Sequence, residues 1–194
     1  MLVRAGQVLA GMSEVRKIVK ESTVAEILSV SGGVVAGIIL SSMTGILERV
    51  PGLLAAIPAF LNMRGAVFSS FGARISTRLH IGELEPKYRL RGLALEEALA
   101  AFTLGISQSV LIGMLAYVVS LFMGTSPSLL HLLGIFAIAG ILSNVIMIVI
   151  TFYSDVWLYR RGIDPNNVIG PYITTIGDTI GLLTIIISVE AMGL

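Results

Sequence analysis

The chain contains five stretches of mainly apolar residues, each long enough to cross a lipid bilayer as a single helix. A helix needs about 20 apolar residues to span the hydrocarbon core. The stretches cover residues 24–47, 51–75, 99–123, 129–153 and 168–189. Because a membrane-spanning segment must satisfy its backbone hydrogen bonds internally, we predict an all-α integral membrane protein with five transmembrane helices.

The composition excludes several other classes of protein. Only 13% of the 194 residues are charged, about half the share in soluble domains, and the mean hydropathy is +0.93. There is no cysteine, so no disulfide framework and no thiolate-bound metal is possible. The net charge of +1 leads us to expect no nucleic-acid partner. We expect a multi-pass protein of the cell membrane, in contact with the lipid bilayer.

The predicted spans divide the chain into two parts. Residues 1–22 precede the first span, and we expect a short amphipathic helix there that lies on the membrane surface. Residues 23–194 then form one five-span membrane domain, because every connection between spans is too short for a separate soluble domain.

The basic residues are distributed unevenly between the two sides of the membrane. With five spans, the N-terminal segment shares one side with the connection between spans two and three and the connection between spans four and five. That side carries eleven of the 13 lysines and arginines: Arg4, Arg16, Lys17, Lys20, Arg74, Arg78, Lys87, Arg89, Arg91, Arg160 and Arg161. The opposite side carries only Arg49. Because basic residues collect on the cytoplasmic side, we predict a cytoplasmic N-terminus and a C-terminus outside.

Asp178 lies near the middle of the fifth stretch. A carboxylate at the bilayer centre costs about 2.5–3.5 kcal/mol on insertion scales, and intramembrane carboxylates mark ion or proton paths. The alternative is a protonated Asp178 that is hydrogen-bonded to a neighbouring helix. Asp155 and Glu190 lie near the ends of stretches, where we expect both to reach water.

The residues around Asp178 place small and polar groups on one face of the predicted helix. Pro171, Thr174, Asp178 and Gly181 follow one another at spacings of three and four, which align on a helix. Gly177 and Gly181 form a small-xxx-small pair that lets a second helix approach closely. The carboxylate, the hydroxyls and the carbonyl oxygens freed by Pro171 give an all-oxygen set, which hard cations such as Mg²⁺ or Ca²⁺ prefer.

The second stretch has a similar face, formed by Pro58, Asn62, Gly65, Ser69 and Gly72 at three- and four-residue steps. Two interpretations fit this face: a kinked helix that packs through small residues, or a broken helix that lines the same path as the fifth. Arg64 lies in this stretch. Its possible roles are to repel cations in a pore, to pair with a carboxylate, or to extend to a membrane surface.

Residues 162–178, GIDPNNVIGPYITTIGD, resemble the signature DP-x-x-V-x-x-P-x-x-T-x-x-x-D of the MgtE family of magnesium transporters. The segment is equally similar to the related animal solute-carrier magnesium transporters. Residues 58–65 and 74–77 resemble the second helix of that membrane domain. The resemblance extends over residues 24–190.

The resemblance implies a homodimer that transports Mg²⁺ along a path between the two copies. Asp178 would bind the ion, helped by backbone oxygens near Thr174 and Gly181. Spans two and five would line the path through Pro171, Thr175, Gly177, Asn62, Gly65 and Ser69. Ala66 stands where family members usually carry asparagine, which leaves the contribution of span two to ion binding open. No segment resembles the cytoplasmic sensor domains of bacterial MgtE proteins, so we expect no attached sensor domain.

A divalent-cation transporter or channel, with Mg²⁺ as the transported ion, is therefore the predicted function. Two alternatives stay open: a non-transporting membrane assembly or regulatory subunit, and an exporter coupled to Na⁺ or H⁺. We do not expect an enzyme, because the spans contain no paired aspartates, no G-x-S-x-G element and no buried histidine base.

Overall fold

The computed structural model describes the backbone of residues 2–194 and the side chains of residues 15–16, 18–20 and 22–194. These residues form helices joined by short loops, and no strand occurs among them. The helices are α1 (Leu2–Ser42), α2 (Thr44–Arg49), α3 (Leu53–His80), α4 (Leu93–Phe122), α5 (Leu129–Arg160) and α6 (Pro165–Ala191).

Five of these helices are long and apolar enough to cross a membrane: residues Ile18–Ser42 of α1, and α3, α4, α5 and α6. The predicted all-α, five-span architecture is therefore confirmed. The predicted ends are less accurate, because α3 and α5 continue past residues 75 and 153 into polar sequence.

The first span ends at Ser42 rather than at residue 47. The hydroxyls of Ser41 and Ser42 donate hydrogen bonds to the carbonyl groups of Ile38 and Ile39. Such local bonds compete with the regular helical pattern. A turn at Met43 follows, and the chain continues into the short helix α2.

The N-terminal segment is continuous with the first span, since α1 is one helix from Leu2 to Ser42. No break occurs at the predicted boundary between residues 22 and 23. The side chains of residues 1–14, 17 and 21 lie outside the described set. The amphipathic character of residues 1–22 therefore stays a prediction.

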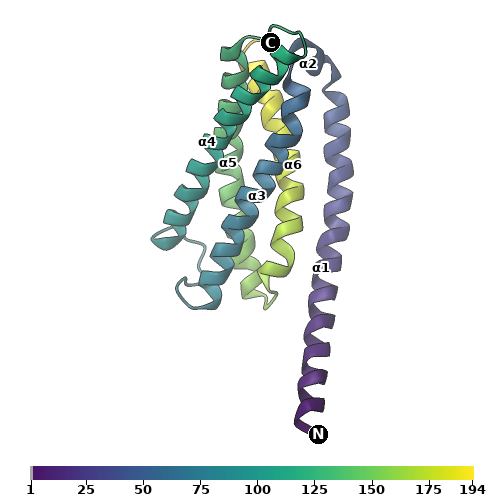
Figure 1. Cartoon of the computed structure of the whole chain (residues 1–194). Helices are drawn as coiled ribbons and strands as arrows, with labels where there is room; N and C mark the ends of the chain where they lie inside the picture. Colours follow the sequence, from purple (N-terminus) through teal and green to yellow (C-terminus); the bar gives the residue numbers. More distant parts are fainter. Residues whose placement is uncertain (1) are drawn as a thin grey trace.

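Helix α6 lies at the centre of the arrangement, in contact with α1, α3 and α5. Figure 1 shows α3, α4, α5 and α6 as a bundle, with α1 along one side and extending beyond it at one end. We call this end, where the chain begins, the N-terminal end, and the opposite one, where Leu194 lies, the C-terminal end. The two termini thus lie at opposite ends, as an odd number of spans requires.

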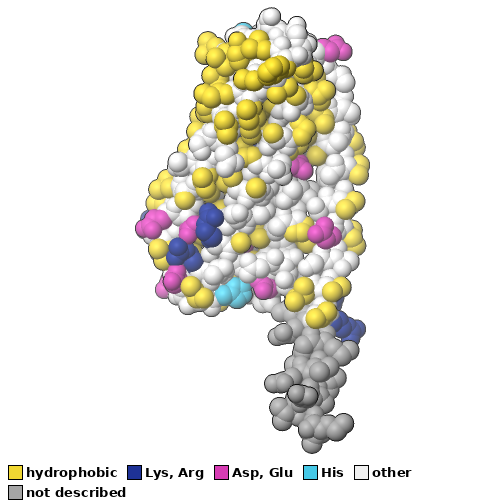
Figure 2. Space-filling model, viewed as in Figure 1, with side chains coloured by type: hydrophobic (Ala, Val, Ile, Leu, Met, Phe, Trp, Pro, Cys, Tyr) yellow, Lys and Arg dark blue, Asp and Glu magenta, His cyan; other side chains and the backbone are white. Residues whose placement is uncertain are grey.

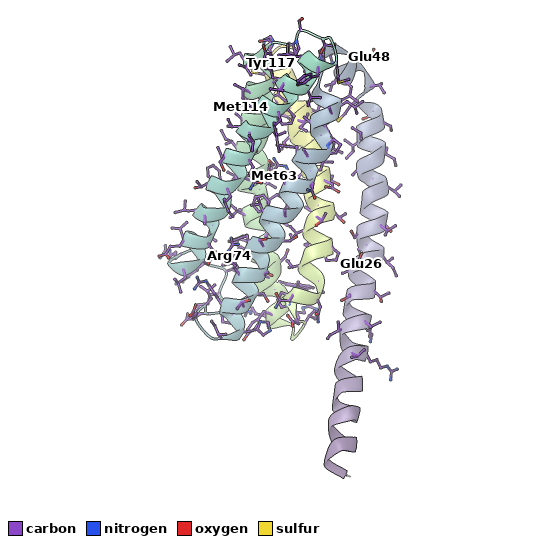
Figure 3. The ribbon with its side chains drawn as sticks, viewed as in Figure 1. Glu26, Glu48, Met63, Arg74, Met114 and Tyr117 are labelled. Carbon is purple, nitrogen blue, oxygen red and sulfur yellow. The ribbon has the colours of Figure 1, made fainter. Side chains whose placement is uncertain are left out.

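Charged side chains gather at the N-terminal end of the bundle, whereas apolar side chains cover the opposite half (Figure 2). Figure 3 places Arg74 toward this end and Tyr117 at the other. The Arg78 guanidinium donates to Glu97 Oε1 through Nε (3.0 Å) and Nη2 (2.8 Å), and Arg74 also pairs with Glu97. These pairs join the last turns of α3 to the first turns of α4. Which end faces the cytoplasm stays a prediction.

One glycine is required by close packing at the C-terminal end. Gly52 precedes α3 with φ 88°, a backbone conformation that favours glycine. A Cβ at Gly52 would lie 3.0 Å from the carbonyl oxygen of Ala116 and would overlap Ser120 Oγ. The start of α3 therefore packs directly on the last turns of α4.

Candidate functional site

Asp178 is the central residue of α6, the fourteenth of its 27 residues. Asp164 caps this helix by accepting a hydrogen bond from the backbone N–H of Asn166 (3.0 Å). Pro165 occupies the first turn, where its missing N–H is not needed. At 1.5 Å per residue, Asp178 lies about 20 Å from each end of the helix. The predicted placement near the middle of a span is thereby confirmed.

The Asp178 side chain is half-buried. No described residue donates a hydrogen bond to its carboxylate or forms an ion pair with it. The predicted alternative, a hydrogen bond from Asp178 to a neighbouring helix, therefore does not occur in this structure. The exposed part of the Asp178 carboxylate is therefore available to a ligand.

The polar groups one turn away from Asp178 already have partners within α6. The Thr174 hydroxyl donates to the carbonyl of Gly170 (2.9 Å), and the Thr184 hydroxyl donates to the carbonyl of Gly181 (3.0 Å). The proton of the Thr174 hydroxyl is therefore engaged, while its oxygen keeps acceptor lone pairs. The carbonyl oxygen of Gly181 accepts the bond from Thr184 in addition to the helical N–H four residues later, so both of its lone pairs are used within α6.

Helix α3 approaches α6 closely beside Asp178. A Cβ at Gly65 would lie 3.1 Å from Thr174 Oγ1, and the Ser69 hydroxyl lies 3.5 Å from the carbonyl oxygen of Gly170. The structure thus brings Gly65, Ser69 and Thr174 together, as the periodicity of both stretches suggested. Asn62 lies on the exposed face of α3.

Thr175 faces a different neighbour. Its hydroxyl contacts Ser29 Oγ (2.7 Å) and the carbonyl oxygen of Pro171 (3.0 Å). Gly32 of α1 packs directly against the Thr175 side chain. Thr175 therefore lies between α6 and α1, on the opposite flank of Asp178 from Gly65.

Arg64 is fully buried between α3 and α6 (0% exposed), although it lies in a predicted span. Its carbon Cζ lies 3.9 Å from the centre of the Phe60 ring, and all three guanidinium nitrogens lack a hydrogen-bond partner in the described structure. The side chain packs against Gly177 and Gly181. Of the three predicted roles, extension to a membrane surface and pairing with a carboxylate do not occur here.

The prediction that Asp155 reaches water is wrong. Asp155 is 0% exposed, and neither carboxylate oxygen has a hydrogen-bond partner. Thr151, one helical turn earlier, is also 0% exposed, and its hydroxyl also lacks a partner. The prediction failed because the apolar window ends at residue 153 whereas α5 continues to Arg160. Thr151 and Asp155 lie four residues apart on either side of residue 153, and this helical spacing is the signal that could have identified them as one polar face. Glu190 is exposed, as predicted.

No group of three or more His, Cys, Asp or Glu side chains within the described part of the chain could hold a metal ion. One chain therefore offers a cation at Asp178 a single carboxylate. The remaining ligands would have to be backbone oxygens, water or groups from a second chain. This donor set fits a hydrated Mg²⁺ ion, which keeps several of its own waters.

The fold and the site together define a multi-pass helical membrane protein with an unpaired carboxylate at the middle of its central helix. The MgtE family, described as divalent cation transporters, matches residues 57–188 of the chain. The match covers more than half of the chain, and the chain therefore belongs to the MgtE family. A comparison with curated proteins finds no match. The predicted family and the multi-pass membrane location are confirmed, and divalent cation transport is the general function of the family.

Proposed function

We propose that the protein transports Mg²⁺ along a path between two copies of the chain, with Asp178 of each copy binding the ion. The unpaired, half-buried carboxylate at the midpoint of α6 carries this proposal. A lone carboxylate at this depth is costly. The charges of two Asp178 side chains would balance those of one divalent ion.

The small and polar faces beside Asp178 support an interface between copies. Asn62 and Ala66 on α3 are exposed, and Ser69 and Thr174 are partly exposed. These residues form a strip of small and polar side chains next to the Asp178 carboxylate. Small residues at such a strip allow two helices from different copies to approach closely.

Arg64 bears on ion binding through its charge. Its Nε lies 3.3 Å from the position of a Cβ at Gly181. Positions three apart on a helix have Cβ atoms about 5–6 Å apart. This places Arg64 Nε within about 9 Å of the Asp178 Cβ position. A buried positive charge at this distance weakens cation binding, which favours release, and conduction requires binding weak enough for the ion to leave.

The driving force for inward movement is the membrane potential. Moving one elementary charge across 100 mV is worth about 2.3 kcal/mol, and a divalent ion gains about twice that. A passive path for a divalent cation therefore supports uptake without a coupling ion.

Uptake into proteoliposomes tests the proposal. Mg²⁺, Ca²⁺ and Mn²⁺ would be compared for the native chain, Asp178→Asn and Glu190→Gln. The last variant is a matched control, because Glu190 is an exposed carboxylate at the end of the same helix. We expect Mg²⁺ uptake to be lost in Asp178→Asn and retained in Glu190→Gln. Equal uptake by all three proteins would contradict the proposal.

A further inference from the structure

A second unpaired carboxylate lies inside the bundle, away from Asp178. Asp155 on α5 is fully buried, and so is Thr151 one turn before it. The two carboxylate oxygens and the Thr151 hydroxyl have no hydrogen-bond partner among the described residues. A buried ionised carboxylate without a partner is strongly disfavoured. Either a proton or a bound cation must therefore neutralise Asp155.

Asp155 and Thr151 both point at Gly72 of α3, where three helices meet. A Cβ at Gly72 would lie 3.1 Å from Asp155 Oδ2, 3.1 Å from Thr151 Cγ2 and 3.0 Å from Ile169 Cγ1. The immediate surroundings supply one carboxylate, one hydroxyl and carbon atoms. Hard metal cations take six or more oxygen ligands, which this pocket does not provide. A proton needs only the carboxylate.

A row of polar groups leads from this pocket toward the N-terminal end. Ser76 lies one turn beyond Gly72 on α3 and is fully buried. Its hydroxyl lies 3.5 Å from His80 Nδ1, and the carbonyl oxygen of Ser76 lies 2.8 Å from the same nitrogen. The His80 side chain is 43% exposed and therefore reaches the surface of the bundle.

Helices α3 and α5 run in the same direction here. The rings of His80 and Tyr159 are in contact, with centroids 5.1 Å apart. His80 lies eight residues after Gly72 on α3, and Tyr159 lies eight residues after Thr151 on α5, so both helices advance equally from one contact to the next. Thr151, Asp155, Ser76 and His80 therefore follow one boundary between the two helices, which we call the α3–α5 seam.

Of the other charged groups on the packed helices, Arg64 of α3 and Asp178 of α6 lie more than two helical turns from Gly72 and Ile169 along their helices, and Glu190 lies at the far end of α6; the remaining ones lie at the surface end. Asp164, at the start of α6, has Oδ1 3.9 Å from His80 Nε2. Arg74 and Arg78 of α3 pair with Glu97 of α4. Tyr159 is the titratable side chain of α5 one turn beyond Asp155. The groups that meet the Asp155 carboxylate around Gly72, namely Thr151 and Ile169, are uncharged.

We propose that Asp155 is a proton-binding site that exchanges with water at the N-terminal end through the α3–α5 seam. In the buried state described here, a proton bonded to one carboxylate oxygen keeps Asp155 neutral. On release, that O–H bond breaks and the electron pair stays on the carboxylate. The proton leaves along the seam toward the exposed His80 imidazole and from there passes to bulk water. Nδ1 of His80 faces the Ser76 carbonyl oxygen, which only accepts, so the imidazole takes up the proton at Nε2. The site is separate from Asp178 and does not require that Asp178 binds a metal ion.

Infrared spectroscopy of the protein in lipid vesicles tests the site without measuring transport. A protonated carboxyl group shows a carbonyl-stretch band that a carboxylate lacks. We expect this band in the native chain at neutral pH, its loss in Asp155→Asn, and its retention in Asp178→Asn and Glu190→Gln. A band that survives in Asp155→Asn, or is lost in Asp178→Asn instead, would overturn the proposal. So would the absence of the band from the native chain.

Two further variants keep the test informative if Asp155→Asn does not fold. Asp155→Glu retains the carboxyl group, so we expect the band to persist at a shifted frequency. An unshifted band would overturn the assignment. His80→Gln leaves Asp155 intact and removes the titratable group at the surface, so we expect slower loss of the band after a jump to alkaline pH. A rate equal to that of the native chain would overturn the route through the seam.

Discussion

The side chain of Arg64 lies directly against Gly181, where a Cβ would come within 3.2 Å of Arg64 Cδ and 3.3 Å of Nε. A buried positive charge on α3 is thus held against the same segment of α6 that carries Asp178. The absence of a side chain at position 181 makes this close approach possible. The geometry of this pair therefore links the packing of α3 on α6 to the electrostatics of the candidate site.

Gly181→Ala should disturb this packing. The new methyl group would lie 2.7 Å from Leu61 Cδ2 as well as close to Arg64. Overpacking of a tight site costs about 1–3 kcal/mol, so we expect a lower unfolding temperature in detergent and reduced Mg²⁺ uptake. Gly37→Ala is the control, because no atom lies within 4 Å of a Cβ there. Equal stability of the two variants would contradict the packing described for Gly181.

Arg64→Met should strengthen Mg²⁺ binding and slow its release. If the ion lies on the order of 9 Å from the guanidinium, a unit charge and a divalent ion repel by about 1–4 kcal/mol for effective dielectric constants of 80 to 20. We therefore expect a Kd for Mg²⁺ at least about fivefold lower, together with a lower maximal uptake rate. Arg64→Lys keeps the charge and should retain the native Kd more closely. An unchanged Kd in folded Arg64→Met would show that Arg64 acts only in packing.

Thr174→Ala should have a mild effect. The expected ligand at this position is the backbone oxygen, which the substitution leaves in place, and the lost hydroxyl bond to the carbonyl of Gly170 lies within α6. We expect uptake within about threefold of the native rate, which is less than 1 kcal/mol. Abolished uptake by a correctly folded Thr174→Ala protein would instead make the hydroxyl a ligand.

Cross-linking tests the interface between copies. The chain has no cysteine, so a single introduced cysteine reports only on its own position. A disulfide requires Cβ atoms about 3.5–4.5 Å apart. We expect Asn62→Cys or Ala66→Cys on α3 to give disulfide-linked dimers in membranes on oxidation. Leu115→Cys is the control, because Leu115 is 53% exposed on α4, away from α6. Equal cross-linking at Leu115 and Asn62 would contradict the proposed interface.

The five spans were predictable from the sequence because each is a long apolar run, and bilayer thickness fixes the length that such a run needs. Asp178 was predictable for the same reason, as a charge in the middle of such a run. The local face of α6 followed from helical spacing, and the structure placed Gly65 and Ser69 beside Thr174.

Other features depended on how the helices pack, which the sequence pattern does not determine. Thr175 is adjacent to Thr174, yet it contacts Ser29 on α1 rather than α3. Asp155 lies past the apolar window, yet the extension of α5 buries it against Gly72. The burial of Arg64 likewise required knowing that two glycines of α6 leave room for it.

Titration of purified protein with Mg²⁺ tests the central claim most directly. The account predicts one bound ion per two chains in the native protein and in Glu190→Gln, and loss of that ion in Asp178→Asn. The same stoichiometry and Kd in folded Asp178→Asn would contradict the claim that Asp178 holds the transported ion.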